Sequence, residues 1–209
     1  MKNSTEEKYW TNRYAEKQMG WDIGYPSGPI KAYIDQLLDK DISILVPGAG
    51  NGYEAEYLFK NGFKNVHVLD ISELPLEDFK KRNPTFQEQK LHHENFFEHT
   101  GTYDLILEQT FFCSFVPTKA NRNAYAQQMS KLLKKRGKLA GVWFTFPLTQ
   151  NMEKRPFGGN KEEYLGYLEP YFEVNFRSLL QFHPRTSRQR ALWHFCEKIK
   201  RLGIKSILI

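Results

Sequence analysis

Two features of this sequence combine residue types and spacing that could do chemistry, a glycine-rich stretch and an acid that follows it. The stretch Gly48-Ala49-Gly50-Asn51-Gly52 comes directly after a short apolar run, and Asp70 ends the next apolar run. Glycines allow main-chain amides to approach a ligand closely. A carboxylate can accept hydrogen bonds from both hydroxyls of an unphosphorylated ribose. The order of strand, glycine loop, helix, strand and acid therefore predicts a site for a nucleoside.

Three glycine-loop chemistries compete for this stretch. A Walker loop ends in Gly-Lys-Ser/Thr, whereas Tyr53 and Glu54 follow Gly52 here. A dinucleotide-binding loop needs its third glycine where Tyr53 stands, and Glu54 and Glu56 would lie unfavourably beside a pyrophosphate. S-adenosylmethionine fits better, because it carries a ribose diol and an amino-acid tail but no phosphate. The alternative is a tight turn with Asp70 as a capping residue.

The elements that must position these residues alternate along the chain. Hydrophobic periodicity and capping residues predict helices over 4–17, 29–38, 53–60, 120–133 and 161–169. Apolar runs predict strands over 42–46, 66–69, 88–92, 103–107, 138–146, 173–176 and 191–196. Strands that alternate with helices favour a mostly parallel sheet covered on both faces, in one α/β domain over residues 1–209.

Composition limits the partners and the compartment. The 209 residues are 40% hydrophobic and 26% charged, which is ordinary for a globular protein. Two cysteines are too few for a disulfide framework, and no stretch has the length of a membrane span or the apolar centre of a signal peptide. The net charge of +6 is dispersed over the sequence, so we expect a cytoplasmic protein with no nucleic-acid partner and no membrane partner.

Several segments resemble those of a known family. The chain is similar to the thiopurine methyltransferase superfamily, and within it to the halide and thiol methyltransferases of the harmless-to-ozone-layer type. The resemblance rests on the segments YWTNRYAEKQMGWDIG, LVPGAGNGYEAEYL, VLDIS, ENFFE, YDLILEQTFFCSFVP and LLKKRGKLAGVWF. It implies the class I S-adenosylmethionine-dependent methyltransferase fold, which is Rossmann-like with a seven-stranded, mostly parallel sheet. It also implies a helical lid over residues 1–40, a core over 41–209, and S-adenosylhomocysteine as the product of the cofactor.

The resemblance assigns residues to the cofactor. With Gly50 of the glycine loop, the expected cofactor-binding residues are Trp10, Tyr14, Trp21, Gly48, Asp70, Asn95, Phe96 and Gln109. An aromatic wall from the N-terminal segment would attract a sulfonium by cation–π interaction. The sequence departs from the family at three of these places: Tyr14 replaces a usual Trp, Ala49 a frequent Cys, and Gln109 a Tyr or Arg.

The acceptor expected from the resemblance is a small, soft nucleophile, namely a thiol or bisulfide, a halide or a thiopurine. An anionic acceptor needs no general base, so we expect an apolar pocket that orients the acceptor and removes its water. Arg155 either attracts an anion or lies on an exposed loop, and Glu108 either acts on the sulfonium or as a base, or binds loop amides. The expected substrate pocket comprises Tyr25, Phe111, Phe112, Phe144, Phe146, Arg155 and Phe157.

Other residue clusters favour less specific interpretations. His92, His93 and His99, with Glu94 and Glu98, lack a helical His pair or a Cys partner, so we expect a surface loop and no metal.

Two alternative functions are retained. One is an N-methyltransferase for a macromolecule, although such enzymes commonly carry Asp/Asn-Pro-Pro-Tyr where Glu108-Gln109-Thr110-Phe111 stands. The other is a cofactor-binding interaction protein without turnover. The expected partner is a small-molecule substrate, and the expected assembly is a monomer or a weak homodimer.

Overall fold

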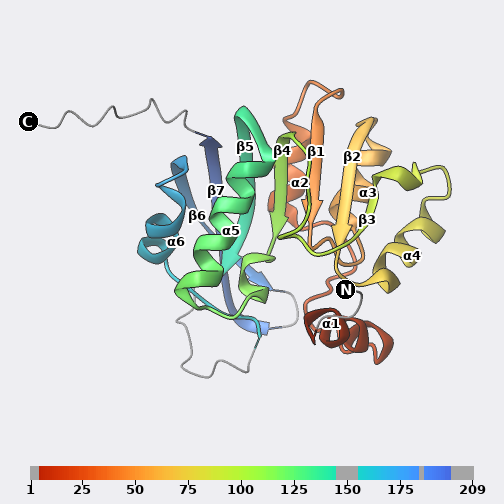
Figure 1. Ribbon diagram of the computed structural model, residues 1–209, viewed down its shortest axis with the longest axis horizontal. Helices are drawn as coiled ribbons and strands as arrows, with labels where there is room; N and C mark the ends of the chain where they lie inside the picture. The colour runs from red at the N-terminus through yellow and green to blue at the C-terminus, as the bar shows by residue number, and fades with distance from the viewer. Residues whose placement is uncertain (1–4, 145–154, 184–185, 199–209) are drawn as a thin grey trace, which may run out of the picture.

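The computed structural model describes residues 5–144, 155–183 and 186–198, with side chains described as far as Val174. Helices and strands alternate along the chain (Figure 1). No helix in these ranges has the length and apolar character needed to cross a membrane. The helices are α1 (Thr5–Ala15), α2 (Gly28–Asp35), α3 (Tyr53–Lys60), α4 (Glu73–Arg82), α5 (Lys119–Leu132) and α6 (Lys161–Leu168), with short 3-10 helices η1 (Glu88–Lys90) and η2 (Phe112–Ser114). The strands are β1 (Ser43–Pro47), β2 (Asn65–Asp70), β3 (Leu91–His93), β4 (Tyr103–Gln109), β5 (Leu133–Phe144), β6 (Phe172–His183) and β7 (Thr186–Lys198).

The strands form one seven-stranded sheet in the order β3-β2-β1-β4-β5-β7-β6. The first five strands of this order run parallel, and β7 pairs antiparallel with both β5 and β6. This confirms the mostly parallel, seven-stranded sheet expected from the sequence. Strand order reverses between β1 and β4, and in open α/β sheets a ligand binds outside the carboxyl ends of the strands at such a point.

The central strands β1 and β4 are buried on both faces, and most of their inner residues are apolar. Ile44 and Val46 of β1 contribute to a core with α2, α3 and α4, whereas Leu45 contributes to a second core with α5 and α6. Figure 1 shows these two helical layers, and it shows α1 apart from them, beyond the carboxyl ends of β1 and β2. The helix α1 buries none of its residues, so it covers the end of the sheet and not a face.

Some elements differ from those predicted. The helix α4 was not predicted, because Pro75 and six charged residues obscure its apolar side. Proline is tolerated in the first turn of a helix, where its missing N–H has no partner to lose. The predicted strand over 88–92 is a 3-10 turn followed by the short β3, and β5 begins at Leu133, five residues before the predicted Lys138.

Candidate functional site

A cavity of about 620 Å³ opens between α1 and the carboxyl ends of the parallel strands. Its walls come from α1 and the loop after it, from the glycine loop, and from the ends of β2 and β4. The segments 95–97 and 109–116 also contribute, as do Asn121, the end of β5 and residues 155–156. The cavity therefore lies where the reversal of strand order predicts a ligand site.

Asp70 connects the glycine loop to the end of β2. The N–H of Gly50 donates to its Oδ2 at 2.8 Å, and the N–H of Ser72 donates to its Oδ1 at 2.9 Å. A carboxylate has about four acceptor positions, so Asp70 keeps capacity for ligand hydroxyls in the cavity that it lines. Burial raises the pKa of Asp70 to about 6.

Position 48 requires glycine for two reasons, its backbone conformation and the lack of room for a side chain. Its φ of +57° lies in the left-handed region, and a Cβ there would lie 2.0 Å from Cδ2 of Phe111. The Phe111 ring thus lies directly against the backbone of the glycine loop and lines the same cavity. A side chain at position 48 would displace this ring.

Aromatic residues of the N-terminal segment form one wall of the cavity. Trp21 contacts Trp10 and Tyr14 edge to face, with ring centroids 5.4 Å and 5.9 Å apart. The cavity-facing residues of α1 recur at helical spacing and are Glu6, Tyr9, Trp10, Arg13 and Tyr14. Sequence reasoning missed Glu6, Tyr9 and Arg13, although this period of three and four residues was a signal that could have found them.

The segment 94–99, which follows β3, is held in place by the helix α5. Gln128 of α5 donates from Nε2 to the carbonyls of Phe96 and His99, at 2.9 Å each. The Asn95 side chain accepts the N–H of Phe97 at 3.0 Å, and Phe96 packs edge to face on Phe111. Asn95 and Phe96 thereby line the cavity on a rigid support.

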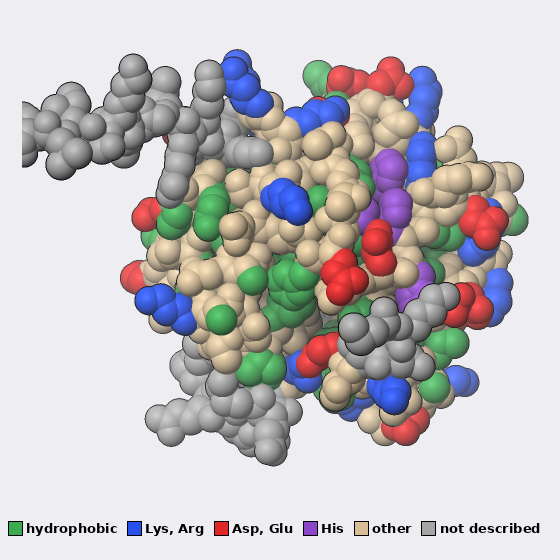
Figure 2. All heavy atoms as spheres, viewed as in Figure 1, with side chains coloured by type: hydrophobic (Ala, Val, Ile, Leu, Met, Phe, Trp, Pro, Cys, Tyr) green, Lys and Arg blue, Asp and Glu red, His purple; other side chains and the backbone are tan. Residues whose placement is uncertain are grey.

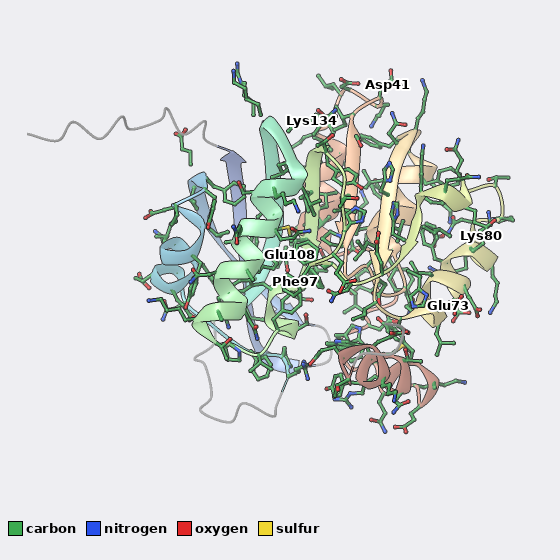
Figure 3. The ribbon with its side chains drawn as sticks, viewed as in Figure 1. Asp41, Glu73, Lys80, Phe97, Glu108 and Lys134 are labelled. Atoms are coloured by element: carbon green, nitrogen blue, oxygen red, sulfur yellow. The ribbon has the colours of Figure 1, made fainter. Side chains whose placement is uncertain are left out.

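Glu108, near the end of β4 (Figure 3), is fully buried and does not line the cavity. Its Oε1 accepts the N–H groups of Phe111 and Phe112, the latter at 2.8 Å, and burial raises the pKa of Glu108 to about 8. Of the roles considered from the sequence, binding of loop amides is the one that the structure shows. Next to it, Thr110 has a φ of +54°, which is unusual for a residue other than glycine.

Most of the predicted cofactor-binding residues are brought together. The structure places eight of them on the cavity: Trp10, Tyr14, Trp21, Gly48, Asp70, Asn95, Phe96 and Gln109. Gly50 is not among the lining residues, because its amide turns away to Asp70. Gln109 accepts the hydroxyl of Ser27 at 2.7 Å, which joins the N-terminal segment to β4.

The predicted substrate pocket is only partly correct. Phe111, Phe144 and Arg155 line the cavity, whereas Tyr25, Phe112 and Phe157 do not. Tyr25 is 53% exposed, and Phe112 and Phe157 are buried in the packed interior. Phe146 lies outside the described residues.

Arg155 is not an exposed loop residue. Its Nη2 lies 2.8 Å from both carboxylate oxygens of Glu6, and its Nε donates to the carbonyl of Ser114 at 2.6 Å. Its guanidinium also lies over the Tyr9 and Trp10 rings, 4.5 Å and 5.5 Å from their centroids. Arg155 therefore ties α1 to the opposite wall of the cavity.

Several residues of the segment after β4 and of the segment after β3 that line the cavity were missed from the sequence. Cys113 donates its thiol to the carbonyl of Thr110, and burial raises its pKa, so it is held as a thiol. Within the described ranges, no histidine or lysine lines the cavity. The missed residues include Phe97, Cys113, Phe115 and Val116.

Comparison with known proteins gives a family match along most of the chain. The family "Thiopurine S-methyltransferase (TPMT)" matches residues 5–203. The chain is 31% identical over 166 residues to "Probable thiol methyltransferase 2" from Arabidopsis thaliana. The matched region covers 77% of this chain and 71% of that relative.

Solved structures share the fold at low sequence identity. One is the N-methyltransferase NodS from Bradyrhizobium japonicum in complex with S-adenosylhomocysteine, with a TM-score of 0.70, 12% identity, and coverage of 94% of this chain and 100% of that one. Another is the 1,6-didemethyltoxoflavin-N1-methyltransferase from Burkholderia thailandensis, with a TM-score of 0.73, 17% identity, and coverage of 93% and 87%. These matches show the class I methyltransferase fold.

Proposed function

Because this chain belongs to the thiopurine S-methyltransferase family and is an S-adenosylmethionine-dependent methyltransferase, we propose that its acceptor is a small, soft nucleophile. The first candidate is a thiolate or bisulfide, and halides and thiopurines are the alternatives. The probable thiol methyltransferase among the relatives supports this order.

The residues around the cavity suit the cofactor part by part. Asp70 would accept the ribose hydroxyls with the acceptor positions that Gly50 and Ser72 leave free. Asn95 and Phe96 would bind the adenine, and the open backbone at Gly48 would admit the amino-acid tail. When bound, S-adenosylmethionine supplies an electrophilic methyl group on a sulfonium sulfur, whose departure as a thioether requires no proton.

One observation carries the choice of acceptor, namely that the cavity offers an apolar wall and that its described residues include no evident base. Each of its charged side chains already has a partner. Arg155 binds Glu6, Arg13 donates to Gln18, and Asp70 binds the glycine loop. An acceptor that is already an anion needs no proton removed, and it gains reactivity when an apolar wall removes its water. Phe111, Phe115, Val116 and Phe144 form such a wall.

The pH dependence of the rate tests this proposal. We would measure kcat/KM against pH for two small thiols whose own pKa values differ by about two units. If the acceptor's ionisation supplies the nucleophile, the midpoint of the profile moves with the thiol's pKa. A midpoint that stays fixed for both thiols would reveal a base on the enzyme and contradict the proposal.

A panel of acceptors separates the alternative functions. The same protein would be supplied with bisulfide, iodide, a thiopurine, and bulk protein and RNA as macromolecular acceptors. We expect methyl transfer to the small acceptors, fastest to the thiols. Label that enters only protein or RNA would favour the macromolecular N-methyltransferase. Cofactor binding without transfer to any acceptor would favour a binding role.

A further inference from the structure

Outside the cavity, two histidines and a glutamate direct ligand atoms toward one another. His92 is on β3, and Glu94 and His99 are in the segment that follows it. Oε1 of Glu94 lies 2.6 Å from Nδ1 of His99 and 3.7 Å from Nδ1 of His92. One ligand atom from each residue lies within 4.8 Å of the other two. Figure 2 shows histidine side chains gathered on one face of the molecule, with acidic side chains beside them.

The second nitrogen of each histidine already has a partner. Nε2 of His92 lies 2.9 Å from Nδ1 of His67, and Nε2 of His99 lies 2.7 Å from the hydroxyl of Tyr103. The His67 and His92 rings are stacked, as are those of His99 and Tyr103. Histidines that bind a metal through one nitrogen almost always donate the other to a carboxylate, a carbonyl or a water, and this second contact fixes the tautomer and the ring. Here His67 and Tyr103 take that place.

We propose that His92, Glu94 and His99 form a binding site for a divalent transition-metal ion, with Zn²⁺ as the best-suited ion. Two imidazoles and one carboxylate are a known ligand set for zinc, with the fourth position taken by water. None of the three residues lines the cavity, so the site is separate from the proposed chemistry.

The two separations between Glu94 and the histidines are close to those that the ion requires. Tetrahedral bonds of about 2.0–2.1 Å place neighbouring ligand atoms about 3.3 Å apart. The two Glu94 distances, 2.6 Å and 3.7 Å, bracket this value. His99 is buried and fixed by Tyr103, whereas the side chain of Glu94 is 39% exposed. A movement of the Glu94 carboxylate by less than about 1 Å would therefore bring both of its distances close to this value.

The position of the site gives it a structural role. Glu94 directly precedes Asn95 and Phe96, and the N–H of Glu94 donates to the carbonyl of Asp70 at 3.2 Å. A metal that joins His92, Glu94 and His99 would close the turn on which the proposed adenine contacts lie. The metal itself would not touch the reacting atoms.

Titration with Zn²⁺ tests the site. Tag-free, chelator-treated full-length protein would be titrated with Zn²⁺ by calorimetry and by competition with a chromophoric chelator. We expect one ion per chain. Co²⁺ in its place should give the intense visible absorption of a four-coordinate site. Glu94→Gln, which keeps the size of the side chain, and His92→Ala should each weaken binding by about tenfold or more, and Tyr103→Phe by about 10- to 100-fold.

A neighbouring histidine supplies the matched control. His93 lies on the same strand, but its Nε2 lies near the carbonyl of Ile71 and near Glu7, away from the cluster. His93→Ala should keep the affinity of the unaltered protein. Equal affinity in His92→Ala and His93→Ala, or no 1:1 binding, would overturn the proposal. If His92→Ala unfolds, as circular dichroism would show, Glu94→Gln decides alone.

Discussion

At the scale of single residues, Asp70 performs two tasks with one carboxylate. It fixes the glycine loop through Gly50 and the start of α4 through Ser72, and it also faces the cavity. Burial raises the pKa of Asp70 to about 6, because removing the charged carboxylate from water is unfavourable. The hydrogen bonds from the Gly50 and Ser72 amides offset only part of this effect. Cofactor binding should therefore depend on the ionisation of this one group.

We expect the affinity for S-adenosylhomocysteine to be constant above about pH 7 and to fall as the pH drops through 6. The ionised carboxylate accepts the ribose hydroxyls, and protonation removes part of that capacity. Asp70→Asn should weaken binding at pH 8 by about 10- to 100-fold, as for the loss of a charged hydrogen bond. Calorimetry at each pH measures this. An equally steep fall in Asp70→Asn would show that another group titrates.

Gly48→Ala should destabilise the protein more than Gly62→Ala. Both glycines have positive φ, +57° and +84°, but a Cβ at Gly62 meets nothing within 4 Å, whereas one at Gly48 meets Phe111. The conformational cost of about 1–2 kcal/mol is common to both variants. Displacement of the Phe111 ring adds about 1–3 kcal/mol to Gly48→Ala alone. Chemical denaturation measures the difference, and equal losses would show that the ring moves freely.

Residue types predicted part of the site but not the direction of each side chain. Asp70 and Gly48 were found because strand, loop and acid follow a fixed order. Phe111 and Phe112 are the same residue type in adjacent positions, yet one lines the cavity and the other is buried in the core. The turn into η2 decides this, and no pattern in the sequence encodes it.

At the scale of elements, the end of β4 is organised by a buried carboxylate. Glu108 receives the first N–H groups of the turn that carries Phe111 and Phe112, so this strand end presents Phe111 to the cavity. Its second oxygen, Oε2, has no hydrogen-bond partner among the described atoms. We infer that Glu108 positions the loop and does not react.

Glu108→Gln should change how stability depends on pH. The pKa of Glu108 in the folded protein, about 8, lies above its unfolded value. Its contribution to stability is therefore complete below about pH 4.5 and is lost as the pH rises through 8. Glutamine carries no charge, so between pH 6 and pH 9 the variant should gain about 2–3 kcal/mol relative to the unaltered protein. Denaturation at both pH values measures this, and a constant difference would contradict the assignment.

Element type was predictable where apolar periodicity was strong. The strands β1, β2 and β4 and the helices α3, α5 and α6 lie close to their predicted ranges. The helix α4 was not predicted because charged residues outnumber the apolar ones in its sequence. The start of β5 was not predicted because Lys134, Lys135 and Arg136 are polar. Arg136 also has a positive φ, and it lies where the pairing of β5 with β4 changes register. Tertiary pairing with β4 overrides the weak local preference there.

At the scale of the whole molecule, the parts of the cavity come from segments far apart in the sequence. The order of the sheet brings the ends of β1, β2 and β4 together, and α1 covers them through Arg155 and an aromatic wall. The resemblance to a family predicted that an N-terminal helical segment covers the site. The sequence did not predict the contact between Arg155 and Glu6 that holds this segment in place. This arrangement agrees with the small acceptor that we propose.

Transfer of labelled methyl to bisulfide tests the central claim most directly. The purified protein would be incubated with methyl-labelled S-adenosylmethionine and bisulfide, and volatile methanethiol would be trapped. We predict label in the trap, lost by about 100-fold in Asp70→Ala. The control Asp78→Ala changes an exposed acid that pairs with Lys81 on the surface of α4, and it should retain the activity. No volatile label, from protein that binds S-adenosylhomocysteine, would contradict the proposed acceptor class.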